Sequence, residues 1–259
     1  MQIATWNING VKARMETLLA WLREAAPDVA CLQEIKAVDD QFPALEIEAA
    51  GYHVETHGQK GFNGVAILSK AKPDEVLRGL PGDPADEQAR YMEAVFSTGS
   101  GVVRVASIYL PNGNPLGTEK FPYKLAWMKR LQARAESLLA LEEPLVLAGD
   151  YNVIPEPRDA RHPEAWTGDA LAQPESRDAF ARLVHLGLTD AVRAVTDEPS
   201  FTFWDYQAGA WQKNNGIRID HLLLSPESAR RLRGVRIDSH VRGWEKPSDH
   251  VPVVVALDV

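Results

Sequence analysis

Short apolar segments, rich in β-branched and aromatic residues and closed by glycine, proline or polar residues, recur along the chain and predict many β-strands. There are too many of them for one small sheet. The predicted strands are Ile3–Trp6, Val29–Leu32, Gly64–Leu68, Met92–Phe96, Val103–Leu110, Leu145–Ala148, Phe201–Trp204, Ile219–Leu224, Val235–Asp238 and Val251–Leu257.

Apolar residues at helical spacing predict three helices between these strands. The repeating positions are Met15, Leu18, Leu19 and Leu22; then Leu125, Met128, Leu131, Leu138 and Leu139; and then Phe180, Leu183 and Val184 before Gly187. Two stretches follow neither period and predict long surface loops, namely residues 80–90 and the segment between Ile154 and Asp178. Connections of that length often have a function.

The order of these elements predicts an α/β fold. Strands alternate with helices, and several strands follow one another directly, which is typical of two packed sheets with helices outside them. No proline- or glycine-rich linker divides the 259 residues, and no fixed-period repeat occurs, so we expect a single catalytic domain over residues 1–259.

Composition narrows the class of protein. The chain is 45% hydrophobic and 25% charged, no apolar run approaches the length of a membrane span, and "MQIATWNING" lacks the features of a signal peptide. We therefore expect a cytoplasmic protein without membrane partners. The single cysteine, Cys31, lies in an apolar run and is expected to be a buried hydrophobic residue. A net charge of −8 argues against nucleic acid as a partner, although local charge distribution can overrule the total.

Polar groups that bind metal or phosphate stand at the ends of six predicted strands. After one such strand, "LAGDYN" could be an ordinary turn, since Asp and Asn favour turns; alternation along the strand would instead point Asp150 and Asn152 to one face. Six repetitions favour one convergent site over six unrelated turns. The groups are Asn7 with Asn9, Glu34, Tyr109 with Asn112, Asp150 with Asn152, Asp220, and Asp249 with His250.

Carboxylate and amide oxygens without cysteine suit a hard cation, Mg²⁺ or Mn²⁺, and phosphate esters are a natural substrate for such a site. His250 could pair with a carboxylate and donate to a phosphoryl oxygen, although an isolated histidine more often satisfies only backbone groups. Asp220 lies in an apolar segment, where a carboxylate needs a partner.

An ordered series of motifs resembles the exonuclease III family, the class II apurinic/apyrimidinic (AP) endonucleases of the endonuclease/exonuclease/phosphatase superfamily. The motifs extend along the whole chain: "NING", "LQEIK", "HGQKGFNGVAILSK", "YLPNGN", "KFPYKL", "GDYNV", "FTFWDYQ", "NNGIRIDHLLLS" and "EKPSDHVPV". The resemblance implies a four-layer α/β sandwich of two mostly antiparallel sheets. It also implies Mg²⁺-dependent hydrolysis of DNA phosphodiesters 5′ to abasic sites and at the 3′ ends of duplexes, by a monomer in the cytoplasm, at the nucleoid.

The resemblance also implies a role for each motif residue. Glu34 would be the main metal ligand, with Asn7 and Asp249 close to the metal. Asp150 would activate the attacking water with help from Asn152, while Asp220 and His250 would form a carboxylate–imidazole pair. Tyr109 and Asn112 would contact the scissile phosphate.

Basic and apolar residues are expected to complete a DNA-binding surface. The basic candidates are Lys12, Arg14, Lys36, Lys60, Arg90, Lys120, Lys124, Lys213 and Arg218. Lys60 lies in a glycine-rich loop that could approach a phosphate or be only a flexible turn. Phe203, Trp204 and Ile217 would form a pocket for an extruded abasic sugar, or belong to the core. An animal relative usually has an aromatic residue at the position of Ile217, and the segment from Pro155 to Gln173 matches the family poorly.

Two other function classes fit part of this pattern. A superfamily phosphoesterase acting on a small phosphate ester or a phospholipid head group would share the metal site but lack the loops "GQKG" and "FTFWDYQ". A catalytically inactive binding module would have lost at least one of the site residues, and none is missing.

Overall fold

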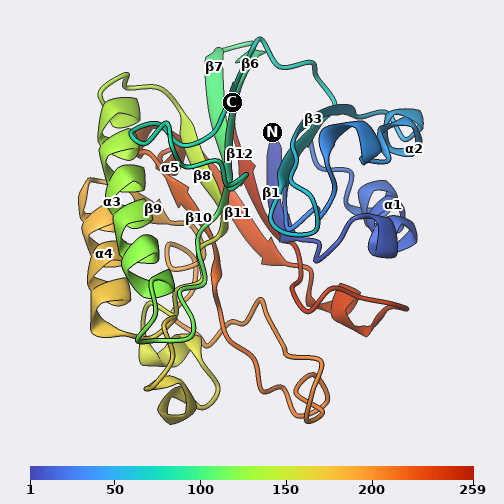
Figure 1. The fold of residues 1–259 in the computed structure, drawn as a ribbon. Coiled ribbons are helices and arrows are strands. Elements are labelled where there is room, and N and C mark those ends of the chain that lie inside the picture. The colour runs from blue at the N-terminus through green and yellow to red at the C-terminus, as the bar shows by residue number, and fades with distance from the viewer.

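Two six-stranded sheets form the centre of the molecule, in a computed structural model that describes residues 1–259 (Figure 1). The order in the first sheet is β11 (Leu232–Ile237), β12 (Val253–Leu257), β1 (Gln2–Asn7), β2 (Val29–Gln33), β4 (Val65–Ser69) and β3 (His53–His57). The order in the second sheet is β5 (Glu75–Arg78), β6 (Tyr91–Thr98), β7 (Gly101–Tyr109), β8 (Leu145–Asp150), β10 (Asp220–Leu224) and β9 (Thr189–Asp190).

The two sheets share one arrangement. In each, the two central strands are parallel, β1 with β2 and β7 with β8, and the other pairs are antiparallel. A parallel pair needs a crossover, which α1 (Met15–Ala25) and α3 (Lys120–Leu139) provide. The strands of each central pair therefore end side by side, with Asn7 opposite Gln33 and Tyr109 opposite Asp150.

Helices cover the outer face of each sheet and produce four layers (Figure 1). The first sheet is covered by α1 and α2 (Ala44–Ala49), and the second by α3 and α4 (Pro174–His185). A short helix, α5 (Pro226–Ala229), and five 3-10 helices complete the structure. These are η1 (Lys12–Arg14), η2 (Asp39–Gln41), η3 (Pro157–Asp159), η4 (Pro163–Trp166) and η5 (Ser239–Gly243).

Burial on both faces of the strands explains why their sequences read as continuous apolar runs. In β2, Val29 and Cys31 pack between the sheets, whereas Ala30 and Leu32 pack beneath the helices. Cys31 is fully buried, as expected, and burial raises the pKa of its thiol. The sandwich and its mostly antiparallel sheets are thus confirmed. None of the helices combines the length and the apolar character that a bilayer crossing requires.

Several predicted boundaries are wrong. Phe201–Trp204 is not a strand, because Phe203 makes only isolated bridges, to Ile217 and His250. The segment between Ile154 and Asp178 contains η3, η4 and the first turn of α4 rather than one long loop. The edge strands β3, β5 and β9 and the short helices α2 and α5 were not predicted, since they are short and have polar, partly exposed faces.

Candidate active site

One pocket of about 220 Å³ lies where the polar strand ends meet. It is reached from both sheets, because the ends of β2, β7 and β8 and the segments before β10 and β12 converge there. Its lining consists of Glu34, Tyr109, Asn112, Asn114, Asp150, Asn152, Trp166, Asp169, Leu171, Phe203, Ile219, Asp249 and His250. The structure therefore brings together the polar residues that the sequence places at separate strand ends.

Asn7 joins the two sheets at the base of this pocket. Its fully buried Nδ2 donates to Oε1 of Glu34 and to Oδ2 of Asp150, both at 2.9 Å. Its Oδ1 accepts the backbone N–H of Asn9 at 3.0 Å. In this geometry Asn7 presents its NH₂ group to the carboxylates of Glu34 and Asp150 and holds them in place.

Glu34 occupies a strained position directly after β2. Its φ of 51° is in the left-handed region, which is uncommon for a residue other than glycine or asparagine and concentrates at functional sites. Burial alone would raise the pKa of its carboxyl group. The hydrogen bond from Asn7 and the charges of Lys36 and His250 outweigh burial and hold the pKa below its usual value. Glu34 therefore stays ionised while it faces the pocket.

Asp150 and Asn152 are linked by a turn rather than by alternation along a strand. β8 ends at Asp150, and the backbone N–H of Asn152 donates to Oδ1 of Asp150 at 2.9 Å. Asn152 has a φ of 46°, and its Nδ2 donates to the carbonyl of Leu110. The turn and the site are thus the same feature, because the turn directs both side chains into the pocket.

A buried carboxylate–imidazole pair faces Asp150. Nδ1 of His250 lies 2.9 Å from Oδ2 of Asp220, which also accepts the Thr202 hydroxyl at 2.6 Å, while Nε2 lies 3.8 Å from Oδ2 of Asp150. Burial alone would lower the pKa of His250, but the charges of Asp220 and Asp150 outweigh it and raise the pKa to about 10. The imidazole is therefore protonated at neutral pH and can donate a proton.

Asp150 faces His250 and has the properties of a base rather than an acid. Its carboxyl group is 1% exposed, and this burial raises its pKa to about 7, against the lowering influence of His250 and of the hydrogen bonds from Asn7 and Asn152. A carboxylate with such a pKa accepts a proton from water more readily than an exposed one does. The pocket thus holds a candidate base and a candidate acid side by side.

Tyr109 and Asn112 form the second wall. The guanidinium of Arg90 lies 4.8 Å from the centre of the Tyr109 ring, and its Nη1 donates to the Tyr109 carbonyl. Asn112 donates from Nδ2 to Oδ1 of Asn152 at 3.2 Å. Burial, followed by the charges of Glu34 and Asp150, raises the pKa of Tyr109, so its hydroxyl keeps its proton. This wall presents hydrogen-bond donors to the pocket.

The donor set fits a hard cation. The pocket is lined by the carboxylates of Glu34, Asp150, Asp169 and Asp249, and no cysteine lines it. Ligand atoms of Asp150, Asp220 and His250 also lie within 4.8 Å of one another and could hold a metal ion. In this cluster Nδ1 of His250 is already hydrogen-bonded to Asp220. Oδ1 of Asp220 is buried and has no hydrogen-bond partner.

Two of the three residues expected in a sugar pocket lie elsewhere. Trp204 is 3% exposed, packs against Phe201 and Trp211, and donates from Nε1 to Asn214. Ile217 is 1% exposed and belongs to the apolar cluster behind the pocket. Only Phe203 reaches the pocket, where its ring centre lies 5.0 Å from that of His250.

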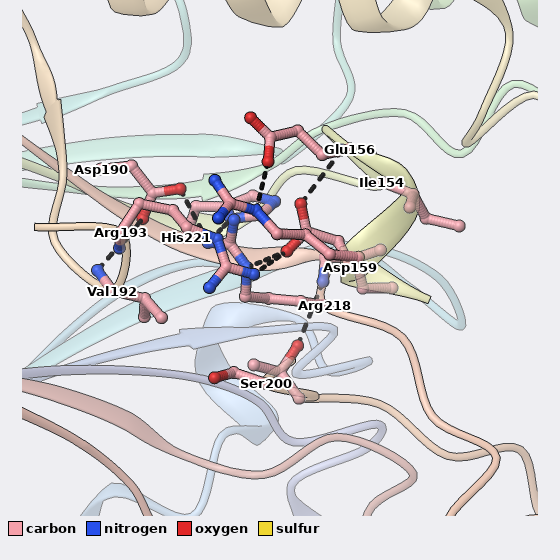
Figure 2. Close-up of polar contacts among 12 residues, drawn as sticks. Ile154, Glu156, Asp159, Asp190, Val192, Arg193, Ser200, Arg218 and His221 are labelled. Atoms are coloured by element: carbon pink, nitrogen blue, oxygen red, sulfur yellow. Dashed lines mark hydrogen bonds and ion pairs between the residues drawn. The ribbon is translucent and has the colours of Figure 1, made fainter. Parts of the chain in front are cut away.

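Arg218 also departs from its expected role. It is 1% exposed, with Nε 2.7 Å from Oδ1 of Asp159 and Nη1 2.7 Å from Oδ2 of Asp190. Figure 2 shows it within a buried network that includes Arg193 and His221. Arg218 therefore ties η3 to β9 and cannot reach a DNA phosphate. Lys124 is likewise fully buried, whereas Lys60 lies exposed in the loop of residues 58–64.

Some lining residues were not anticipated from the sequence. They are Asn114, Trp166, Asp169 and Leu171, which reach the pocket from loops or from η4. Asn114 stands in the motif "YLPNGN", whereas the other three belong to a segment without a periodic pattern, where no sequence signal indicated their position. Asn9, which was expected at the site together with Asn7 in the motif "NING", donates from Nδ2 to Oδ1 of Asp249 at 3.1 Å.

The chain matches known proteins over its whole length. It is 38% identical to "Exodeoxyribonuclease III" of Haemophilus influenzae, over 98% of each chain. It is 32% identical to "DNA repair nuclease APEX1" of Danio rerio, over 100% of this chain and 83% of the relative.

Solved structures with the same fold give a similar result. The 3′ phosphatase NExo from Neisseria, bound to a product DNA hairpin, superposes with a TM-score of 0.95 at 38% identity. An AP endonuclease from Archaeoglobus fulgidus superposes with a TM-score of 0.94 at 36% identity. Both comparisons cover 100% of each chain. Residues 4–250 match the Endonuclease/Exonuclease/phosphatase family, to which this chain belongs.

Proposed function

We propose that the protein is a Mg²⁺-dependent DNA repair hydrolase, which cleaves phosphodiester bonds 5′ to abasic sites and removes nucleotides or blocking groups from the 3′ ends of duplex DNA. The observation that carries this proposal is the facing pair of Asp150 and His250, a buried base and a buried acid in one pocket. Relatives named as DNA exonucleases and repair nucleases support DNA as the substrate.

In this proposal each side chain has one step in the hydrolysis of a phosphodiester. Asp150 accepts a proton from the attacking water, and the turn to Asn152 together with Asn7 fixes the orientation of its carboxylate. His250, held by Asp220, donates a hydrogen bond from Nε2 to a phosphoryl oxygen as negative charge develops there. The bond from phosphorus to the leaving 3′ oxygen breaks as the bond to water forms, and the leaving oxygen takes its proton from solvent. Tyr109 and Asn112 donate hydrogen bonds to the phosphate from the opposite wall.

Mg²⁺ would be held by Glu34, with Asp249 close by, and when bound it would neutralise negative charge on the phosphate. Asn7 keeps the Glu34 carboxylate turned towards Asp150, and Lys36, 3.1 Å from Oε2, keeps it ionised. Mn²⁺ is a suitable substitute, because it prefers the same oxygen ligands.

Loops around the pocket supply a surface for duplex DNA. Gln59, in the glycine-rich loop that carries Lys60, accepts the N–H of Ala89, and Asn63 contacts Gln88. The loop of residues 80–90 thus braces the glycine-rich loop and places Arg90 beside Tyr109. The exposed Lys60 in that loop and the partly buried Arg90 beside Tyr109 favour a polyanion over a small phosphate ester. The protein is expected to act as a monomer.

The test uses a labelled duplex that contains a single abasic-site analogue, incubated with the protein in the presence and absence of Mg²⁺. We expect Mg²⁺-dependent incision at the analogue together with stepwise shortening from the 3′ ends, and the ratio of the two products measures the balance of activities. A small phosphate ester serves as the comparison substrate. Hydrolysis of the ester without any cleavage of the duplex would contradict the proposal.

A further inference from the structure

Lys124 occupies an unexpected position in the second sheet's helical layer. The buried face of α3 consists of Lys124, Trp127, Met128, Leu131, Ala135 and Leu138, and every one except Lys124 is apolar or aromatic. A lysine that is 0% exposed is rare and costly, because its charge loses hydration. A methionine or leucine would fit this helical stripe without that cost. The presence of an amine therefore calls for a partner inside the protein.

The partners of this amine belong to the active site. Nζ of Lys124 donates to the carbonyl of Asn112 at 3.1 Å and to the carbonyl of Asn152 through a shorter hydrogen bond. Both acceptors are neutral backbone groups rather than carboxylates. The two asparagines follow β7 and β8, and their side chains are themselves joined, since Asn112 donates to Asn152. One ammonium group thus fastens both turns from beneath the pocket.

The surrounding chain leaves room for this side chain. Gly113 has a φ of 90°, and a Cβ atom there would lie 2.8 Å from Cδ of Lys124, which is closer than such atoms approach. Burial lowers the pKa of Lys124 to about 7, while the charges of Asp150 and Asp169 oppose that shift. The positive charge therefore depends on the negative groups around the pocket.

We propose that Lys124 is a positioning residue for the reaction. It holds the carbonyls of Asn112 and Asn152 together, so that the two side chains meet the substrate phosphate in one fixed arrangement. This inference rests on the proposed function for its catalytic part. The residue does not touch DNA, because α3 and the two turns enclose it completely.

Substitution of Lys124 by methionine provides the main test. The change keeps the length of the side chain on an apolar stripe but removes the amine, and Lys129→Met, on the exposed side of the same helix, is the matched control. Displacing the asparagines should lower kcat by about 100-fold, whereas KM and the affinity for DNA should change little. The melting temperature should fall only modestly, because removal of a costly buried amine partly offsets the two buried carbonyls left without a donor. Lys129→Met should behave as the wild type.

A double-mutant cycle with Asn112→Ala distinguishes an effect of Lys124 through Asn112 from an independent effect on the rest of the protein. If Lys124 acts through the asparagine pair, Lys124→Met should add little to the loss of kcat already caused by Asn112→Ala. Fully multiplicative losses would overturn the proposal. So would wild-type kcat in Lys124→Met, and in that case the wild-type enzyme's cleavage of DNA would leave the proposed function intact.

A measurement on the unaltered protein covers the case in which Lys124→Met does not fold. In the ¹⁵N spectrum of the lysine ammonium groups, Lys124 should give a hydrogen-bonded signal that exchanges slowly with water. A rapidly exchanging signal, like those of surface lysines, would overturn the proposal. This readout needs no DNA and no metal, so it remains decisive even if the protein fails to cleave the duplex.

Discussion

At the scale of single residues, the site depends on two buried groups whose surroundings shift their proton affinities to make one a base and the other an acid. Asp150 is buried beside a proton donor, and His250 lies between two carboxylates. Asp150 therefore loses its proton as the pH rises through about 7, whereas His250 keeps its proton well above neutral pH. The pair also explains why Asp220, which does not line the pocket, belongs to the chemistry.

Replacing Asp150 by asparagine should remove the base while preserving shape. We expect kcat to fall by about 10²- to 10⁴-fold, because the amide cannot accept the proton of water. DNA affinity should change little, since Asp150 makes its contacts to Asn7 and Asn152 inside the protein. Single-turnover cleavage and fluorescence anisotropy measure the two quantities. Strong residual cleavage would remove Asp150 from the mechanism.

The pH dependence of kcat/KM should show two limbs. Asp150 acts without its proton, and burial raises its pKa to about 7, so activity should rise as the pH increases through 7. His250 acts with its proton, and Asp220 and Asp150 together overcome burial to raise its pKa to about 10, so activity should fall above pH 10.

Replacing Asp220 by asparagine removes the largest charge that raises the pKa of His250. The alkaline limb should therefore move to lower pH, which a pH series on the variant measures. Asp40→Asn, at an exposed position, should leave the profile unchanged. An alkaline limb that stays in place in Asp220→Asn would mean that His250 is not the group responsible for it.

At the scale of elements, Arg218 illustrates how a buried charge joins segments. Arg218→Met would leave Asp159 and Asp190 with one partner fewer, and Asp159 is fully buried. We expect the free energy of unfolding to fall by about 3–5 kcal/mol, which urea denaturation measures. Arg230→Met removes an exposed pair with Glu227 and should cost less than about 1 kcal/mol. Equal effects of the two changes would contradict a structural role for Arg218.

The glycine-rich loop that carries Lys60 is predicted to contact a DNA phosphate. Lys60 is exposed in that loop, so Lys60→Ala should lower the slope of log affinity against log salt by about 1, because one phosphate contact is lost. Lys129→Ala, remote from the loop, is the control. Binding titrations at several salt concentrations give the slope, and an unchanged slope in Lys60→Ala would show that Lys60 contacts no phosphate.

Elements with a strong period were predictable, and those set by tertiary contacts were not. The apolar runs of β2 and β8 identified strands because both faces are buried. Phe201–Trp204 has strand-like composition, yet single bridges on either side of Phe203 replace a ladder. Arg218 and Lys124 looked like DNA contacts because both lie in family motifs with basic character. Only the packing around them, absent from any local pattern, places them inside.

At the scale of the whole molecule, the two sheets share one core. Ile3, Val29 and Ile67 of the first sheet pack against Met92 and Val146 of the second. Gln33 and Ser107 add a hydrogen bond across the interface at 3.1 Å. Neither sheet therefore buries its inner face alone.

The shared core predicts cooperative unfolding of residues 1–259 as one domain. Differential scanning calorimetry should show a single transition, with equal calorimetric and van't Hoff enthalpies. Two resolved transitions would instead show that the halves fold independently.

The matching strand order of the sheets has a further consequence for how activity can be lost. Asn7 ends β1 and Tyr109 ends β7, and these two strands occupy corresponding positions in the two sheets. In the neighbouring strands, Glu34 directly follows β2 and Asp150 ends β8. The proposed cation ligand, Glu34, thus belongs to one sheet, and the proposed base, Asp150, belongs to the other. A lateral shear of one sheet over its neighbour would pull these groups apart while every strand ladder stayed intact. A slip at the interface between the two sheets would therefore abolish activity before any secondary structure is lost.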